Sequence, residues 1–268
     1  MIVVGYANRW KIIMNAVVTP QKRLYQKIGQ GLKDRIVSGE FVVGDRLPPE
    51  REIAVQCQVS RSVVREALIM LELQDVVEVR KGSGVYIINQ PKEDIDAKTG
   101  TSESDDAGPF EMLQARQLLE SHIAEFAATQ VTRNDIFRLR KALQMERQQI
   151  EGASFDYDGD KMFHMAIAEA TQNKVLVDMV EDLWVRRQNS SMWLQLHARI
   201  VNQNYRKAWL EDHEKILLAL QHRDASAARD AMWQHLENVK QTLLELSDVD
   251  DPLFDGFLFS NNPVVSLA

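Results

Sequence analysis

The sequence predicts a mostly α-helical protein, in which an N-terminal winged helix–turn–helix precedes an all-α antiparallel bundle of about six or seven helices. Three observations predict this class. Amphipathic helical patterns fill most of the 268 residues, one pair of short β-branched runs lies near residue 80, and a polar acidic stretch divides the chain. The net charge is +2 over residues 21–90 and −11 over residues 91–268. A mildly basic front before an acidic rear suits a module that binds a polyanion.

Three helices are expected at the front. The first is predicted by apolar residues at every fourth position: Leu24, Ile28, Leu32 and Ile36. Gly39 marks its end. The second helix has Pro49 in its first turn and Glu50 near its positive end, and the third begins at Ser60, a good N-cap. This order of helices is the layout of a helix–turn–helix domain.

A small hairpin follows the third helix, because the β-branched runs "VVEVR" and "GVYII" are joined by "KGSG". The hairpin would be the wing, and the third helix would enter the major groove by its N-terminal end. The candidate DNA contacts lie at the starts of the second and third helices and at the wing tip: Arg51, Ser60, Arg61, Ser62, Arg65, Lys81 and Gly82. Arginine pairs with guanine edges or phosphate, and serine can bind phosphate. Singly these residues could be ordinary solvated charges, but the ordered set favours DNA binding.

These patterns divide the chain into five segments. Residues 1–20 are interpreted as an N-terminal extension and 21–90 as the DNA-binding domain. The polar, acidic run at 91–108 reads as a linker. A helical domain is expected over 109–247, followed by a tail at 248–268.

The composition favours a cytoplasmic protein. The single cysteine, Cys57, cannot form an internal disulfide, and no apolar run approaches the ~20 residues of a membrane span. The N-terminus lacks the continuous apolar region of a signal peptide. Because Met14 stands just before the first convincing helix, the sequence leaves open whether residues 1–13 belong to the native protein.

The rear of the chain is predicted to be helical throughout. The helical patterns cover residues 110–130, 134–152, 157–171, 174–188, 204–222 and 224–246. In the first of these helices the inward-facing residues are expected to be Leu113, Leu118, His122, Ile123, Phe126 and Ala127. Short connections make neighbouring helices antiparallel.

Polar side chains lie on apolar helix faces in this domain. Asp160 and His164 are four residues apart, so they share a helix face that continues into apolar residues. His213 and His235 also have apolar neighbours at helical spacing. One aspartate and three histidines from three helices could converge on a divalent ion, with zinc expected first and nickel or manganese as alternatives.

Helical phase does not exclude other interpretations. Each of these histidines could be a core residue with a hydrogen-bonded ring, and His122 also lies near an apolar stripe. His222 is half a turn out of phase with His213 and is expected to be exposed, whereas His197 cannot be placed by phase.

Arg116 is the other notable charge, because arginine binds carboxylates through its two-pronged guanidinium. A surface ion pair with Glu120, four residues later, is the simpler interpretation.

The motifs of this chain resemble those of a known family. The stretch from Arg23 to Ile88, including "GDRLPPEREIAVQCQVSRSVVREAL", resembles the GntR-type winged helix of bacterial regulators. The rear motifs "ARQLLESHIAEFAA", "DKMFH", "DHEKILLAL" and "AMWQHLENV" resemble the FCD effector domain of the FadR subfamily. The resemblance implies a homodimer that binds palindromic operator DNA, with contacts at Arg51, Ser60, Arg61, Arg65, Lys81 and Gly82. It also implies that the metal is held by Asp160, His164, His213 and His235, and that Arg116 meets the effector carboxylate.

Within this family the sequence is similar to regulators of hexuronate use. The resemblance implies a transcriptional repressor that a sugar acid such as fructuronate or glucuronate releases from its operator. A regulator responding to galacturonate, gluconate or lactate is the alternative. A metal-dependent enzyme is a further alternative, because an aspartate and three histidines could activate water. That alternative leaves the DNA-binding module unexplained and identifies no general base, so we expect no enzymatic activity.

Overall fold

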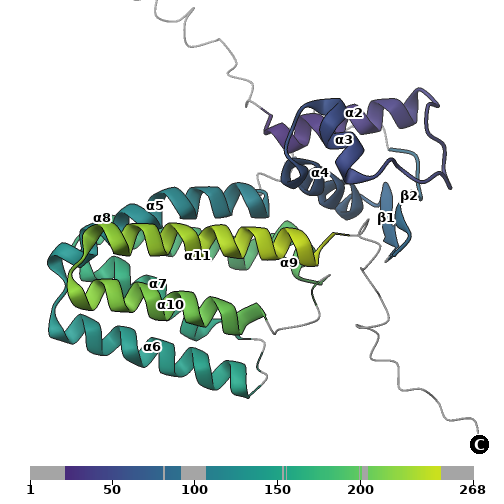
Figure 1. Ribbon diagram of the computed structural model, residues 1–268. Coiled ribbons are helices and arrows are strands. Elements are labelled where there is room, and N and C mark those ends of the chain that lie inside the picture. The colour runs from purple at the N-terminus through teal and green to yellow at the C-terminus, as the bar shows by residue number, and fades with distance from the viewer. Residues whose placement is uncertain are drawn as a thin grey trace, which may run out of the picture.

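The computed structural model describes residues 22–80, 82–91, 107–152, 154, 156–198, 200 and 205–248 (Figure 1). The expected extension at 1–20, Lys81, and most of the expected linker and tail lie outside these residues. The described elements form a small N-terminal domain and a larger helical domain, which confirms the predicted fold class.

The N-terminal domain is a winged helix–turn–helix. Its elements are α2 (Leu24–Val37), α3 (Glu50–Cys57), α4 (Arg61–Leu73), β1 (Val77–Arg80) and β2 (Gly84–Ile87). The turn between α3 and α4 passes through Gln58, whose φ of 54° is left-handed, and Ser60 caps α4 by accepting the Val63 N–H at 3.5 Å.

The wing is an antiparallel pair in which Val77 lies opposite Ile87 and Val79 opposite Val85. Gly84 has a φ of 107°, a backbone conformation that a residue with a Cβ rarely adopts. The core of this domain is formed by apolar residues from all five elements and the segments between them: Leu32, Ile36, Leu47, Ile53, Ala54, Val64, Leu68, Leu71, Val76, Val77, Val85 and Ile87.

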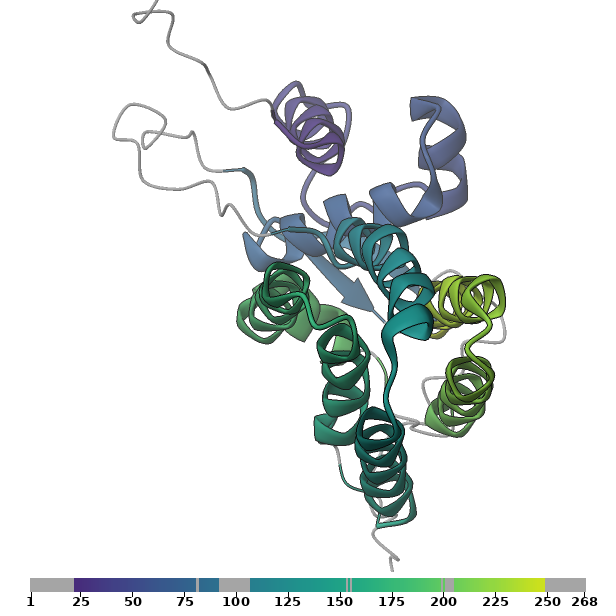
Figure 2. The same cartoon turned by 90° about the vertical axis from the view of Figure 1, so that its left-hand side faces the viewer.

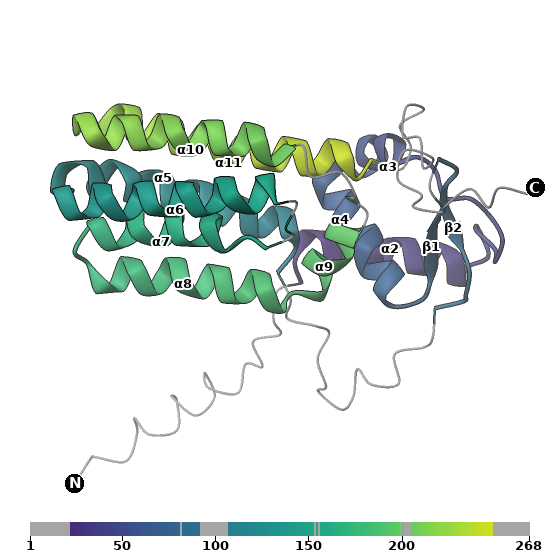
Figure 3. The same cartoon turned by 90° about the horizontal axis from the view of Figure 1, so that it is seen from below.

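The rear domain contains seven helices in the described part of the chain. They are α5 (Pro109–Gln130), α6 (Arg133–Glu151), α7 (Asp158–Ala170), α8 (Lys174–Asn189), α9 (Ser191–Ala198), α10 (Tyr205–His222) and α11 (Ala225–Leu246). The long helices run side by side, with the winged helix at one end (Figure 3). Seen nearly end-on, α5 lies between the α10–α11 pair and the helices of the opposite side (Figure 2). It packs against α7, α8, α10 and α11.

The central position of α5 overturns part of the expected inward face. Leu113, Ile123 and Ala127 are buried as expected. Leu118, His122 and Phe126 are instead exposed, with Leu118 at 58%. The buried face of α5 holds four polar residues that periodicity treats as outward: Arg116, Gln117, Glu120 and Ser121. When a helix has neighbours on most sides, as α5 does, the position of its apolar stripe does not identify its buried face.

The two domains are packed together. Tyr25, Ala67 and Ile69 of the winged helix share one apolar core with Phe110 at the start of α5. Glu66 on α4 accepts the backbone N–H groups of Phe110 at 2.7 Å and Glu111 at 2.9 Å, at the positive end of α5. These contacts fix α4 against the helical domain.

Candidate metal centre and DNA-reading surface

The four predicted metal ligands converge inside the helical domain. His164 from α7, His213 from α10 and His235 from α11 are buried, and their ligand atoms lie within 4.8 Å of one another. The Nε2 atoms of His213 and His235 are 3.1 Å apart. Asp160 Oδ1 lies 3.3 Å from His164 Nε2 and 3.8 Å from His213 Nε2. Side chains that helical periodicity places on the apolar faces of three separate helices therefore come together in one cluster.

Each histidine of this cluster has a carboxylate near its Nδ1 atom. The pairs are Glu120 with His164, Glu146 with His213, and Asp212 with His235. The Nδ1–H of His213 donates to Glu146 Oε2 at 2.8 Å, whereas Asp212 Oδ2 is 3.9 Å from His235 Nδ1. A carboxylate beside Nδ1 favours a proton there and leaves the Nε2 lone pair facing the centre, the arrangement that supports metal-binding histidines.

The charges around the cluster act differently on its members. Burial lowers the pKa of His164, but Glu120 and Asp160 outweigh burial and raise it. Burial raises the pKa of Glu120, but Arg116 and His164 outweigh burial and hold that pKa at about 2. Burial and the neighbouring His213 lower the pKa of His235 to about 3, so its ring is neutral. Among the described residues, the buried Nε2 of His164 has no hydrogen-bond partner. Imidazole nitrogens and a carboxylate in one buried cluster suit zinc, nickel or manganese.

Gly159 lets the helices around the cluster approach closely. A Cβ at this position would lie 2.4 Å from the backbone N of Glu146 and 2.5 Å from its Cα. Only glycine allows α7 to touch the backbone of α6 here, and this contact places Glu146 beside His213.

The supporting carboxylates were not predicted, although sequence signals for them exist. Glu120 is four residues after Arg116 on a helix rich in apolar residues. Glu146 is in helical phase with the buried Leu139 and Ala142, and Asp212 directly precedes His213. A carboxylate in phase with core residues is costly unless it is paired, so each was a candidate partner for a buried histidine.

The other three histidines lie elsewhere. His122 and His222 are exposed, as expected for His222. His197 on α9 is half-buried and stacks on Trp193 with ring centroids 5.2 Å apart. Geometry therefore selects the three clustered histidines over His122, which phase alone could not do.

Arg116 forms the expected pair with Glu120, but the pair is buried rather than on the surface. Its Nε donates to Glu120 at 2.6 Å, and its guanidinium lies 4.6 Å from the ring centroid of Trp184. Only 5% of Arg116 is exposed. Nε and Nη2 of Arg116 both donate to Glu120, so this edge of the guanidinium is already paired with a carboxylate of the protein itself.

The candidate DNA contacts are not equally accessible. Arg51, Ser60 and Gly82 are exposed, and Ser62 is half-buried. The hydroxyls of Ser60 and Ser62 share a hydrogen bond of 2.8 Å. Lys81 lies outside the described residues.

Arg65 departs from the expectation of a DNA contact. Its side chain is fully buried, and its guanidinium binds both carboxylate oxygens of Glu50. The same group donates to Ser247 Oγ and, at 3.2 Å, to the backbone carbonyl of Leu244 at the end of α11. One turn of helix beyond Arg61, the chain faces α11 rather than solvent, so Arg65 holds the domains together in this structure.

Arg61 is also tied to the helical domain. It forms an ion pair with Asp248, just after α11, and its side chain is 31% exposed. Asp248 therefore pairs with Arg61, a side chain that the sequence predicts to contact DNA.

No helix in the described residues combines the length and the apolar character needed to cross a membrane.

Comparisons with known proteins match both parts of the chain. The pattern of "Bacterial regulatory proteins, gntR family" matches residues 24–87, and that of the "FCD domain" matches residues 111–238. A "Uxu operon regulator" of Haemophilus influenzae is 55% identical over 243 residues, which are 91% of this chain and 90% of the relative. A "Uxu operon transcriptional regulator" of Escherichia coli is 51% identical, over 92% of this chain and 96% of the relative. A solved GntR structure of Streptococcus agalactiae is 25% identical over 81% of this chain and 99% of that one, with a TM-score of 0.44.

Proposed function

Because this chain belongs to the GntR family of bacterial regulatory proteins and carries an FCD domain, it is a DNA-binding transcription regulator, and we propose that it represses genes of hexuronate catabolism. The observation that carries the proposal is the 55% identity to a Uxu operon regulator over 91% of the chain. Its relatives are transcription regulators rather than enzymes. A fructuronate or glucuronate ligand would release the operator, and the protein would act in the cytoplasm, where bacterial DNA lies.

We propose that Asp160, His164, His213 and His235 hold a divalent ion, zinc before nickel or manganese. The proposal is supported by the convergence of these side chains, the unpartnered Nε2 of His164 and the carboxylates at the Nδ1 positions. When bound, the ion would supply a Lewis-acidic position that attracts an oxygen of an acidic ligand. Glu146 and Glu120 would keep the His213 and His164 rings oriented toward it.

The proposed switch is an equilibrium between two arrangements of the winged helix. In the described arrangement, Asp248 and Ser247 at the end of α11 hold Arg61 and Arg65. The same helix carries His235, so α11 connects the centre of the bundle to the DNA-reading helix. A sugar acid that binds this arrangement better than the DNA-bound one would lower operator affinity by linkage.

We propose that DNA is contacted by the exposed or half-exposed candidates together with the wing tip: Arg51, Ser60, Arg61, Ser62, Lys81 and Gly82. Arg61 would exchange Asp248 for DNA. Arg65 would support α4 from within rather than touch a base.

We propose that the regulator is a homodimer on a palindromic operator, with its two α4 helices in successive major grooves. The exposed Leu118 and Phe126 lie on one side of α5, and a second copy would explain why this side is apolar. Phe126→Glu should shift the sedimentation coefficient to that of a monomer. Phe137→Glu on α6, where the phenylalanine is 67% exposed, is the matched control.

The operator selection experiment tests the proposed function. Purified protein is mixed with sheared genomic DNA, and bound fragments are sequenced with and without each sugar acid at a saturating concentration, about 100 times its measured Kd. Enriched fragments should lie beside hexuronate genes and be released by fructuronate or glucuronate. The Arg61→Ala variant should enrich nothing. Release by galacturonate, gluconate or lactate alone would reassign the effector, and enrichment beside unrelated genes would refute the proposal.

A further inference from the structure

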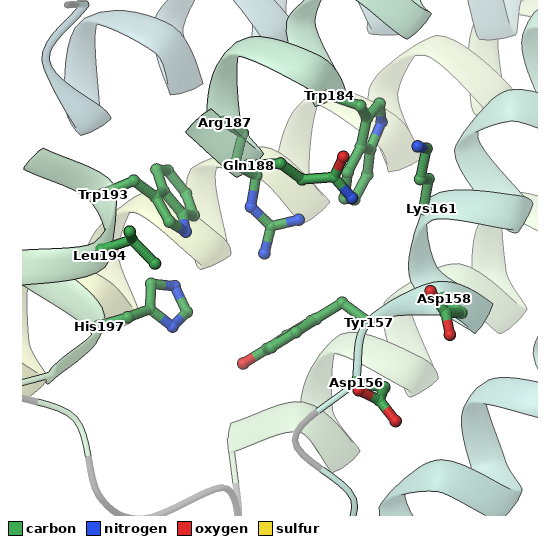
Figure 4. Close-up of a pocket in the computed structure, with 10 residues that line it drawn as sticks. All are labelled: Asp156, Tyr157, Asp158, Lys161, Trp184, Arg187, Gln188, Trp193, Leu194 and His197. Carbon is green, nitrogen blue, oxygen red and sulfur yellow. The ribbon is translucent and has the colours of Figure 1, made fainter. Parts of the chain in front are cut away.

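A cavity of about 340 Å³ lies between the start of α7, the end of α8 and α9 (Figure 4). Its lining includes the aromatic side chains Tyr157, Trp184 and Trp193, together with Arg187 and His197. As far as the structure describes it, the lining contains none of the four converging ligand residues. The cavity nevertheless adjoins them, because Arg187 Nη1 lies 3.7 Å from Asp160 Oδ2. A cavity of this volume with aromatic walls is in the range that small ligands occupy.

Arg187 is the charged group of this cavity. Its guanidinium lies 4.6 Å from the ring centroid of Trp184, 4.7 Å from that of Trp193 and 5.0 Å from that of Tyr157. Only 7% of the residue is exposed. Within the described part of the chain its guanidinium donates no hydrogen bond, and Asp160 at 3.7 Å is too distant for one. A buried guanidinium with unused donors is costly unless a ligand accepts them.

Arg116 and Arg187 therefore differ in the feature that matters for a carboxylate ligand. Arg116 already donates twice to Glu120, at 2.6 and 3.4 Å. Arg187 keeps a planar fork that can bind a carboxylate through two parallel hydrogen bonds. Figure 4 shows this guanidinium pointing into the cavity between Trp193 and Trp184, with the Tyr157 ring across from it.

Two further groups of the lining have unmet hydrogen-bonding capacity. The indole Nε1 of Trp184 and the imidazole Nε2 of His197 are buried and have no partner among the residues that the structure describes. Hydroxyl groups of a ligand could meet this capacity through small side-chain rotations. The Tyr157 ring is held in place, because its hydroxyl shares a hydrogen bond of 2.6 Å with that of Tyr205 and Arg206 lies over its face at 4.3 Å.

We propose that this cavity binds the effector and that Arg187, rather than Arg116, holds the effector's carboxylate, while Tyr157 and Trp193 pack against its carbon skeleton. The inference rests on the proposed function and identifies the residues by which an acidic sugar is told from a neutral one. The cavity also offers a route to the DNA-binding domain. Trp193 and His197 belong to α9, and α9 packs against α4, so a ligand that moves α9 bears directly on the DNA-reading helix.

The test is a calorimetric titration of the full-length, metal-replete protein with D-fructuronate, D-glucuronate and the neutral sugars D-fructose and D-glucose. Arg187→Gln should weaken sugar-acid binding about 10- to 100-fold, as expected for a lost charge-assisted pair, and leave the weak neutral-sugar binding unchanged. Arg187→Lys should recover part of the affinity, because it keeps the charge but not the fork. Thermal unfolding and metal content of each variant verify folding.

Two variants control for charge and for aromatic loss. Arg186→Gln removes an exposed arginine from the adjacent position on α8, where Asp182 pairs with it at 2.6 Å, and should change no affinity. Trp193→Leu should weaken binding of acid and neutral sugars alike, whereas Trp233→Leu, at a tryptophan 42% exposed on α11, should not.

The outcomes separate this inference from the proposed function. If wild-type protein binds hexuronates and Arg187→Gln binds them within twofold, the assignment of Arg187 is wrong and the hexuronate function stands. If Arg116→Gln loses binding and Arg187→Gln does not, Arg116 is the residue that holds the effector carboxylate. If wild type binds only another acid, such as lactate, and does so through Arg187, the cavity assignment stands and the hexuronate function falls. Binding of no acid at all would overturn both.

Discussion

The centre of the helical bundle and the junction of α4 with α11 are both buried clusters of charged groups, but they leave different groups available. At the centre, Glu146 binds the Nδ1–H of His213, and the Nε2 atoms of the histidines converge. At the junction, Glu50 binds Arg65 and Asp248 binds Arg61, both on α4. At the centre the ligand atoms face one another, whereas at the junction the arginine side chains are already paired with carboxylates of the protein.

The same type of contact, a carboxylate paired with a basic side chain, has opposite consequences in the two regions. A carboxylate that binds the far side of a histidine ring prepares the near side for a ligand. A carboxylate that binds the end of an arginine fork uses the donors that DNA would need. The position of the acid relative to the reactive edge decides which result follows.

Loss of a central histidine should have the largest effect. His213→Ala should reduce bound metal from about one ion per chain to near zero by elemental analysis, because one ligand and its oriented support are removed together. Glu146→Gln should keep the ion but weaken its affinity about 10- to 100-fold. His222→Ala, at the exposed end of the same helix, is the control. Full metal content in His213→Ala would show that the cluster is not a metal site.

Arg65 should behave as a structural residue. Arg65→Met leaves the carboxylate of Glu50 buried without its partner, so the free energy of unfolding should fall by about 3–5 kcal/mol in urea titrations. Arg61→Met removes the same charge from a partly exposed side chain and should cost about 1 kcal/mol or less. Equal effects of the two variants would mean that the junction described here does not form in solution.

Glu66 should make the packing of the two domains sensitive to pH. Burial raises the pKa of Glu66 from its ordinary 4.5 to about 7, against the opposing effect of the two backbone N–H groups that it accepts. The contribution of Glu66 to the free energy of unfolding is therefore complete below pH 4.5, decreases as the pH rises, and is lost above pH 7. The total change corresponds to roughly 3 kcal/mol.

Glu66→Gln tests this pH dependence. Both N–H groups bind the same oxygen, Oε1, which the amide of glutamine can replace. Unfolding free energies at pH 5 and pH 8 should differ less in the variant than in the wild type. The same difference in both proteins would assign the pH dependence to other groups.

Asp248→Asn should have the smallest effect. It removes the acid that pairs with Arg61, so effector-free affinity for operator DNA should rise about fivefold in anisotropy titrations, the equivalent of about 1 kcal/mol. Glu245→Gln changes the net charge equally at an exposed position of α11 and should raise affinity much less. Equal increases in operator affinity in the two variants would mean that the effect comes from the net charge of the protein and not from the pair with Arg61.

Helical phase predicts most of this fold, and its successes share one condition. On α10, His213 and its apolar neighbours Ile216, Leu217 and Leu220 are all buried, because this helix has one covered face. On α5 the apolar residues Leu118 and Phe126 are instead exposed, because that helix has neighbours on most sides. Periodicity identifies a stripe but cannot say which stripe is covered when a helix is surrounded.

The remainder of the candidate site depends on contacts between distant segments. Arg65 meets Ser247, 182 positions away, and no local pattern around Arg65 indicates this contact. Glu120 and Glu146 likewise become supports only after α5, α6, α7 and α10 have packed. The family resemblance selects His213 and His235 over His122, and it assigns the effector to Arg116, whereas the structure leaves the donors of Arg187 unused.

The most direct test of the account is the affinity of the metal-replete protein for its operator, measured by fluorescence anisotropy while D-fructuronate is titrated in. Coupling between the effector cavity and the operator predicts that the apparent Kd rises at least about tenfold at saturation, which corresponds to a coupling free energy of roughly 1.4 kcal/mol, and that this shift disappears in Arg187→Gln. An operator affinity that stays constant under saturating fructuronate and glucuronate would contradict it.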